Sequence, residues 1–233
     1  MQSTNRALAV EERVTLPVET RSYALSRTLV ALDRQAKSDS EAFRALRTHI
    51  MARHVEEGRR ALAVCAATQG VGCTFVAANL AVALSQIGVK TLLVDANMRN
   101  PRIDRLFEPS DEIAGLQQCL LSNDDSFADF IQPDVLPDLS ILFAGGSPHN
   151  PQELLATDRY AELMGVCSRD YDMTIIDTPP ANSCSDAHRV STVAGYSLVV
   201  VRKNVSLVGD VRTLVAQLES DRARVIGTVL TEG

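Results

Sequence analysis

Residues Ala67-Thr-Gln-Gly-Val-Gly-Cys-Thr74 join an apolar run, Ala61-Leu-Ala-Val-Cys-Ala66, to a second one, Phe75-Val-Ala-Ala-Asn-Leu-Ala-Val-Ala-Leu84. The first run has the length of a buried strand, and the second has the length of a helix. A glycine-rich turn between a strand and a helix is typical of a phosphate-binding loop, in which backbone N–H groups and the helix N-terminus bind phosphate. The stretch therefore predicts an α/β fold with a nucleotide site.

Cys73 occupies the position at which such a loop carries lysine. Gly70 and Gly72 are retained, and Thr74 supplies the hydroxyl that such a loop offers to Mg²⁺. Since the lysine neutralises phosphate oxygens, we expect nucleotide binding to persist where phosphoryl transfer is impaired. Two interpretations of the thiol remain: a reactive group with a pKa lowered by the helix N-terminus, or a small residue tolerated in place of lysine.

The composition is that of a globular protein, with 233 residues and 45% hydrophobic content. A net charge of −6 argues against nucleic acid as a partner. No apolar run approaches the roughly 20 residues that span a bilayer, and the first thirty residues contain no signal peptide, so we expect a cytoplasmic protein that reaches the membrane through a partner. The five cysteines are scattered, which indicates free thiols in a reducing compartment.

Expected strands and helices alternate after residue 24, and residues 1–24 are expected to form a flexible tail. The helix pattern near residue 40 has Ser40 as its N-cap. Expected strands span residues 61–66, 90–95, 139–143, 172–177, 196–201 and 224–230. Expected helices span residues 40–57, 73–87, 111–121, 124–132, 151–168, 185–194 and 207–221. This order predicts one domain, residues 25–233, built as a doubly wound, mostly parallel sheet with helices on both faces.

Two aspartates fall at the carboxyl ends of expected strands, where such sheets bind their ligands. Asp95 follows Thr91-Leu-Leu-Val94, and Asp177 follows Met173-Thr-Ile-Ile176. A carboxylate in this position holds Mg²⁺ or polarises an attacking hydroxyl, although a simple turn aspartate is the structural alternative. Arg202, just past another expected strand, is a candidate for contacting a nucleotide base, and a surface arginine is its alternative.

Five ordered motifs together resemble the bacterial tyrosine kinases (BY-kinases) of capsule and exopolysaccharide assembly, in their cytoplasmic CpsD/CapB form. They are Ser40-Glu-Ala-Phe-Arg-Ala-Leu-Arg47, the glycine-rich loop, Leu92-Leu-Val-Asp-Ala-Asn-Met-Arg-Asn-Pro101, Asn150-Pro-Gln-Glu-Leu-Leu155 and Tyr171-Asp-Met-Thr-Ile-Ile-Asp-Thr-Pro-Pro180. The resemblance covers roughly residues 25–232. It implies a deviant P-loop NTPase fold of the MinD/ParA kind and a membrane polysaccharide co-polymerase whose cytoplasmic tail activates the kinase.

The resemblance also assigns roles to individual residues. It implies ATP or ADP binding by Gly70, Val71, Gly72, Cys73, Thr74 and Phe75. Mg²⁺ would be held by Thr74, Asp95 and Asp177, and Asp95 would also activate the tyrosine. Glu41, Arg44 and Arg47 match a motif through which neighbouring subunits contact one another in a homo-oligomeric ring. Their spacing places them on one helix face, for which a solvated face with an intrahelical ion pair is the alternative.

Three departures from the family all concern phosphoryl transfer. Cys73 replaces lysine, Asn97 replaces a second aspartate, and we expect the tyrosine-rich tail to be absent because the chain ends at Gly233. The four tyrosines form no cluster. Three hypotheses follow: a kinase-like regulator of exopolysaccharide synthesis with impaired or lost transfer, an active ATP-dependent tyrosine kinase, or a positioning ATPase of the MinD/ParA kind.

Overall fold

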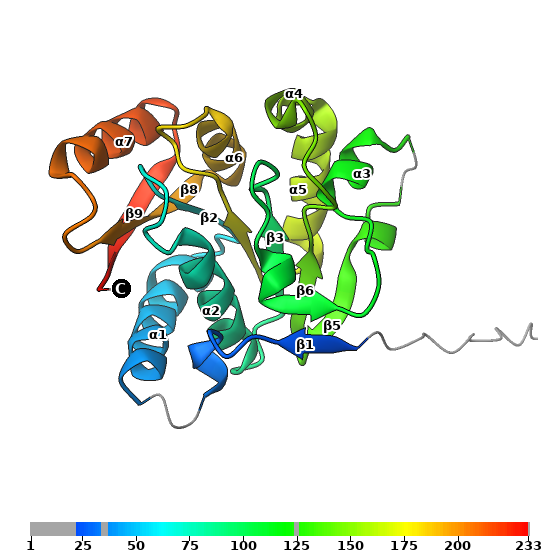
Figure 1. Cartoon of the computed structure of the whole chain (residues 1–233), viewed down its shortest axis with the longest axis horizontal. Coiled ribbons are helices and arrows are strands. Elements are labelled where there is room, and N and C mark those ends of the chain that lie inside the picture. The colour runs from blue at the N-terminus through cyan, green and yellow to red at the C-terminus, as the bar shows by residue number, and fades with distance from the viewer. Residues whose placement is uncertain (1–21, 34–36, 124–125, 233) are drawn as a thin grey trace, which may run out of the picture.

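A seven-stranded sheet of order β5-β6-β3-β7-β2-β8-β9 forms the centre of the computed structural model, which describes residues 22–33, 37–123 and 126–232 (Figure 1). All neighbouring strands are parallel except β5, which is antiparallel to β6. The strands are β2 (Ala61–Cys65), β3 (Thr91–Asp95), β5 (Gln132–Leu136), β6 (Leu139–Leu142), β7 (Met173–Asp177), β8 (Tyr196–Arg202) and β9 (Arg224–Thr231). The mostly parallel sheet confirms the predicted fold class.

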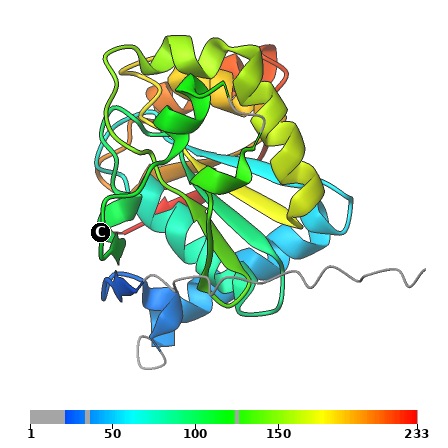
Figure 2. The ribbon, with the colours of Figure 1, turned by 90° about the vertical axis from the view of Figure 1, so that its right-hand side faces the viewer.

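Helices cover both faces of this sheet (Figures 1 and 2). One face packs against α1 (Lys37–Ile50) and α2 (Cys73–Ser85). The other face packs against α3 (Leu116–Leu121), α4 (Pro151–Ala156), α5 (Asp158–Asp170), α6 (Asp186–Ala194) and α7 (Val208–Ser220). Burial on both faces explains the continuously apolar strands, because alternate side chains enter opposite halves of the core. In β2, for example, Leu62 and Val64 face α2, whereas Ala63 faces the other helix layer.

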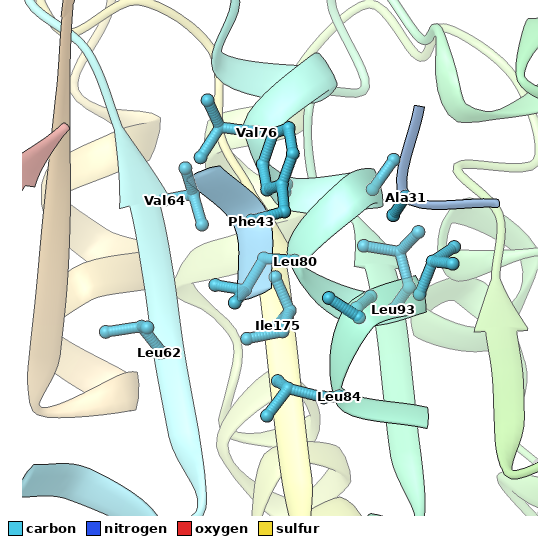
Figure 3. Packing of buried hydrophobic residues seen from close by; sticks show 14 of the residues in the cluster. Ala31, Phe43, Leu62, Val64, Val76, Leu80, Leu84, Leu93 and Ile175 are labelled. Carbon is cyan, nitrogen blue, oxygen red and sulfur yellow. The ribbon is translucent and has the colours of Figure 1, made fainter. Parts of the chain in front are cut away.

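Helix α2, which follows the glycine-rich loop, lies deep in the core. Every residue from Val76 to Ser85 is buried. Figure 3 shows Val76, Leu80 and Leu84 packed among side chains of the sheet and of Phe43 from α1. The amide of Asn79 is a polar group buried within this interface. Asn79 donates from Nδ2 to the Thr28 carbonyl oxygen at 3.1 Å and accepts at Oδ1 from the Ala31 N–H at 3.0 Å. These bonds fix the N-terminal segment, including the 3₁₀ turn η1 (Val30–Leu32), against α2.

The N-terminal segment also forms a small second sheet. β1 (Tyr23–Leu25) pairs antiparallel with β4 (Phe107–Pro109). The tail expected at residues 1–24 therefore overlaps a strand at its last two positions, and residues 1–21 lie outside the described residues. A three-residue strand whose partner lies more than 80 positions away has no local signature, which is why sequence patterns missed it.

Two helix predictions were wrong. The segment predicted as helix 124–132 contains a 3₁₀ turn, η4 (Ala128–Phe130), and strand β5 begins at Gln132, while residues 124–125 lie outside the described residues. Helix α1 begins at Lys37, so Ser40 lies inside it and is not its N-cap. Ser40 is 2% exposed, and its hydroxyl has no hydrogen-bond partner among the described residues.

Three helix boundaries also differ from the predictions. The helix predicted at 151–168 is interrupted at Thr157, which is extended and donates from its hydroxyl to the Leu154 carbonyl oxygen at 2.7 Å. Helix α3 begins only after Gly115, where a Cβ atom would lie 2.1 Å from the Phe143 carbonyl oxygen. The first helix is α-helical only as far as Ile50, and a π-helical turn, η2 (Met51–Val55), follows it directly.

This π-helical turn buries a histidine. The Nε2–H of His54 donates to the Ala61 carbonyl oxygen at 3.1 Å, and the ring meets that of Tyr196 edge-on at 5.0 Å between centroids. Burial disfavours the charged imidazolium and lowers the pKa of His54 to about 4.

We predict that the free energy of unfolding falls as the pH is lowered, because the buried His54 resists protonation in the native state. The native state binds fewer protons than the unfolded state between pH 6.5 and 4, so stability is retained above this range and lost as the pH falls through it. Between pH 7 and pH 5 the loss due to His54 should be on the order of 1–2 kcal/mol. Urea denaturation should show this loss in the wild type and not in His54→Gln, whose amide can still donate to Ala61. Equal pH dependence in both proteins would contradict the prediction.

Candidate functional site

The glycine-rich loop connects the end of β2 to the start of α2, as predicted. Gly70 and Gly72 have φ values of 79° and 93°, a left-handed region in which other residues are strained. Gly72 immediately precedes α2, and the first helical hydrogen bond runs from the Val76 N–H to the Gly72 carbonyl oxygen. The preceding N–H groups of the first turn have no partner within the helix, so they are available to an anion.

A cavity of about 440 Å³ opens over this loop. Its walls come from the loop, from the segment after β3 and from the segment after β7. The lining includes Gly70, Val71, Gly72, Cys73, Thr74, Phe75, Asn97, Arg99, Arg102, Arg105, Thr178 and Pro180. All six predicted phosphate-loop residues therefore line one cavity, at the carboxyl ends of the parallel strands.

The two predicted aspartates lie side by side at strand ends next to the loop, although neither lines this cavity and Asp95 lines a second one. Asp95 and Asp177 end neighbouring strands in direct register and are 1% and 0% exposed. Asp177 Oδ2 accepts a hydrogen bond of 2.6 Å from the Thr74 hydroxyl, whereas Oδ1 is buried without a partner among the described residues. Asp95 instead accepts three main-chain N–H groups, from Asn97 at 3.1 Å, Arg102 at 3.2 Å and Ile103 at 3.1 Å.

Burial makes this acid pair electrostatically unfavourable. Loss of water raises the pKa of both carboxyl groups, and the negative charge of Asp177 raises the pKa of Asp95 further. A divalent cation relieves such a cost, since it prefers hard oxygen ligands. The Thr74 hydroxyl and the unpaired oxygen of Asp177 are such ligands, and the loop N–H groups suit phosphate. The residues present thus fit a magnesium nucleotide.

Cys73 does not point its thiol at the phosphate position. Its Sγ donates to the Val64 carbonyl oxygen at 3.0 Å, back toward the end of β2. Burial, followed by the negative charge of Asp177, raises the pKa of the thiol well above its ordinary value. The interpretation of Cys73 as a thiol with a lowered pKa is therefore wrong, because the desolvation and the carboxylate outweigh the helix N-terminus.

Two arginines near the cavity have internal partners. Arg99 forms two hydrogen bonds with the fully buried carboxylate of Asp186, at 2.8 and 3.1 Å. Sequence patterns gave no signal for this pair, whose members are 87 positions apart. Arg202 donates from Nη1 to the Gly70 carbonyl oxygen at 2.9 Å and so braces the loop. Its contact with a nucleotide base stays a prediction.

The charged stripe on α1 divides into two parts. Glu41 and Arg44 form an exposed ion pair at 2.9 Å, with 68% and 46% of their side chains accessible. Arg47 instead donates to the Ala83 carbonyl oxygen at 3.2 Å, in the last turn of α2. A cation at this negative end of the helix stabilises it. Glu41 and Arg44 therefore remain available to a partner, whereas Arg47 joins α1 to α2.

The structure describes all four tyrosines of the chain, of which Tyr23, Tyr171 and Tyr196 are half-buried. Tyr160 is completely buried. Tyr23 stacks on Phe143 with 6.4 Å between ring centroids, and Tyr196 lies beneath the guanidinium of Arg59. A tyrosine of this chain would have to leave its packing to enter a second molecule's site.

The parallel sheet, the glycine loop at the start of a buried helix and the Thr74–Asp177 contact define a P-loop NTPase. A family model described as an AAA domain matches residues 59–223. The chain is 36% identical over 189 residues to the putative tyrosine-protein kinase EpsB of Ralstonia nicotianae, which covers 81% of this chain and 25% of EpsB. It is 30% identical over 200 residues to the putative tyrosine-protein kinase CapB of Staphylococcus aureus, covering 86% of this chain and 87% of CapB.

Among solved structures, the kinase domain of Escherichia coli tyrosine kinase ETK superposes with a TM-score of 0.81 at 33% identity, covering 88% of this chain and 79% of that domain. The cell-division ATPase MinD of Pyrococcus furiosus shares the fold, with a TM-score of 0.64 at 22% identity over 74% of this chain and 71% of that structure. This chain belongs to the bacterial tyrosine kinase family. It spans about a quarter of the length of EpsB. Within the described ranges, no helix is long and apolar enough to cross a membrane.

We predict that Cys73 reacts slowly with thiol reagents. Its raised pKa leaves little thiolate at pH 7.5, and its sulfur is engaged with Val64. Iodoacetamide labelling of the native protein, followed by peptide mass spectrometry, should modify Cys73 about tenfold more slowly than glutathione. Labelling in urea provides the control for full reactivity. Modification of native Cys73 faster than glutathione would contradict the prediction.

Proposed function

We propose that this protein is a nucleotide-binding, kinase-like subunit that regulates exopolysaccharide polymerisation and export through a membrane co-polymerase, with impaired phosphoryl transfer. The single observation that carries the proposal is the difference in side-chain direction between two neighbouring loop residues, Cys73 and Thr74. Thr74 holds its hydroxyl against Asp177, as a magnesium site requires, while Cys73 turns its thiol away to Val64. The half of the site that binds metal is retained, and the lysine that neutralises the phosphates is not.

Each part of the site has a defined role in this proposal. The N–H groups at the start of α2 bind the phosphates, and Thr74 with Asp177 holds Mg²⁺. When bound, Mg²⁺ shields phosphate charge. Asp95 is the candidate to receive the proton of an incoming hydroxyl. Asn97 is 7% exposed, and its amide cannot act as a base.

The missing cation accounts for impaired transfer. Removing one stabilising group for developing charge costs about 10²–10³ in rate. The acceptor is the second limitation, because Tyr160 is buried and the other three tyrosines are half-buried against neighbouring residues. Any transfer would therefore be directed at a partner's tyrosine. The partner of the proposal is the cytoplasmic tail of the co-polymerase, which would also hold the protein at the inner face of the membrane.

An active tyrosine kinase is the second candidate, favoured by the intact acid pair and by the arginines that line the cavity. The positioning ATPase has less support, since the likeness to MinD concerns the fold alone.

We predict that the wild type binds ADP only in the presence of Mg²⁺, because the metal relieves the buried acid pair. Asp177→Asn should abolish the Mg²⁺ dependence in titration calorimetry. Cys73→Lys should bind ADP about tenfold more tightly and increase phosphotyrosine on the co-polymerase tail by about 10²-fold. Equal phosphorylation by the wild type and Cys73→Lys would favour the active kinase, and failure of the wild type to bind nucleotide would refute the proposal.

We also predict self-association through the exposed pair on α1. Glu41→Ala and Arg44→Ala should each shift the protein toward the monomer in sedimentation velocity, without altering its melting temperature, because both side chains are exposed. Arg47→Ala should lower stability by about 1 kcal/mol, through loss of its bond to Ala83. Glu219→Ala, an exposed change on α7, is the control. Unchanged association in both variants would remove Glu41 and Arg44 from the interface.

A further inference from the structure

The loop has no cation of its own, so any positive charge on a bound phosphate chain must come from another segment. Three arginines line the cavity, namely Arg99, Arg102 and Arg105. Arg99 is held by two hydrogen bonds to the buried Asp186 carboxylate, which neutralises its charge. Arg102 and Arg105 are exposed, and neither guanidinium forms an ion pair or hydrogen bond within the described part of the chain.

Main-chain contacts distinguish Arg102 from Arg105. The N–H of Arg102 donates to Asp95 Oδ2 at 3.2 Å, and the N–H of Ile103 donates to the same oxygen at 3.1 Å. The backbone from which the Arg102 side chain extends is therefore fixed to the acid pair. Arg105 lies one turn further on, within the 3₁₀ turn η3 (Ile103–Arg105), and lines a second cavity as well.

The charge of Arg102 also acts on the acid pair. Burial is the main influence on the pKa of Asp177 and raises it, while hydrogen bonding, chiefly from Thr74, and the positive charge of Arg102 act in the opposite direction. The main-chain contacts of Arg102 with Asp95 and its place in the cavity wall therefore agree with this electrostatic contact.

We propose that Arg102, from the segment after β3, supplies positive charge to the β-phosphate of a bound nucleotide, whereas the charge that a lysine at residue 73 would place on the γ-phosphate stays missing. This inference rests on the proposed nucleotide binding. A guanidinium presents paired N–H donors that match phosphate oxygens, so one arginine suffices for recognition of a diphosphate. Its position outside the loop explains how a nucleotide can still bind to a loop that keeps its glycines and Thr74 but has Cys73 in place of lysine.

The test measures binding of ADP and AMP with Mg²⁺ by titration calorimetry. Arg102→Ala should weaken ADP binding by about tenfold or more and AMP binding much less, since AMP lacks the β-phosphate. Arg105→Ala removes the same charge one turn away and should change ADP binding by less than about threefold. Adding Cys73→Lys to Arg102→Ala should restore ADP affinity to near the wild-type value. Arg102→Lys, which keeps the charge, should lose less affinity than Arg102→Ala.

Each alternative outcome has a separate meaning. Wild-type ADP binding that Arg102→Ala leaves unchanged would overturn this inference and leave the proposed function intact. Equal losses of ADP affinity in Arg102→Ala and Arg105→Ala would overturn it too. They would indicate that the general positive charge around the cavity, and not one particular arginine, attracts the phosphates. Absence of nucleotide binding by the wild type would overturn both. Unchanged thermal melting of Arg102→Ala shows that its effect on binding is not due to unfolding.

Discussion

The hydrogen bond of 2.6 Å between Thr74 and Asp177 connects the two halves of the site. It joins the first turn of α2 to the end of β7, two segments that meet because β2 and β7 are adjacent and pair Val64 with Asp177. Asp177 in turn lies in register with Asp95, whose carboxylate organises the segment that carries Arg102. Loop, acid pair and candidate cation are therefore positioned relative to one another by a single sheet, and their geometry follows from strand order.

The loop is held in place by contacts that do not involve a ligand. Arg202 donates to the Gly70 carbonyl oxygen, and the Thr231 hydroxyl donates to that of Val71 at 2.9 Å. Both side chains come from the ends of β8 and β9, on the side of β2 opposite the acid pair. A loop braced in this way pays little ordering cost when an anion binds. Preorganisation of this kind favours binding of an anion by the loop.

Much of this arrangement could be predicted from the sequence, because apolar strands, a glycine loop and terminal aspartates are local patterns. The parallel sheet, the loop and the placement of Asp95 and Asp177 at strand ends are of this kind, whereas the adjacency of the two aspartates depends on the pairing of β3 with β7. The bond of Arg99 to Asp186, that of Arg47 to Ala83 and the pairing of β1 with β4 join distant segments and have no local pattern. The direction of the Cys73 thiol was also beyond prediction, since it depends on the Val64 carbonyl oxygen beneath the loop.

That carbonyl oxygen determines how residue 73 can be changed. Val64 accepts the Cys73 thiol, and it also accepts the Thr178 hydroxyl at 2.9 Å. A lysine introduced at residue 73 would give up the first bond, but the oxygen would keep the second and would not be left unsatisfied in the core. The fold around the loop can therefore accept either side chain at residue 73 without a second, compensating substitution.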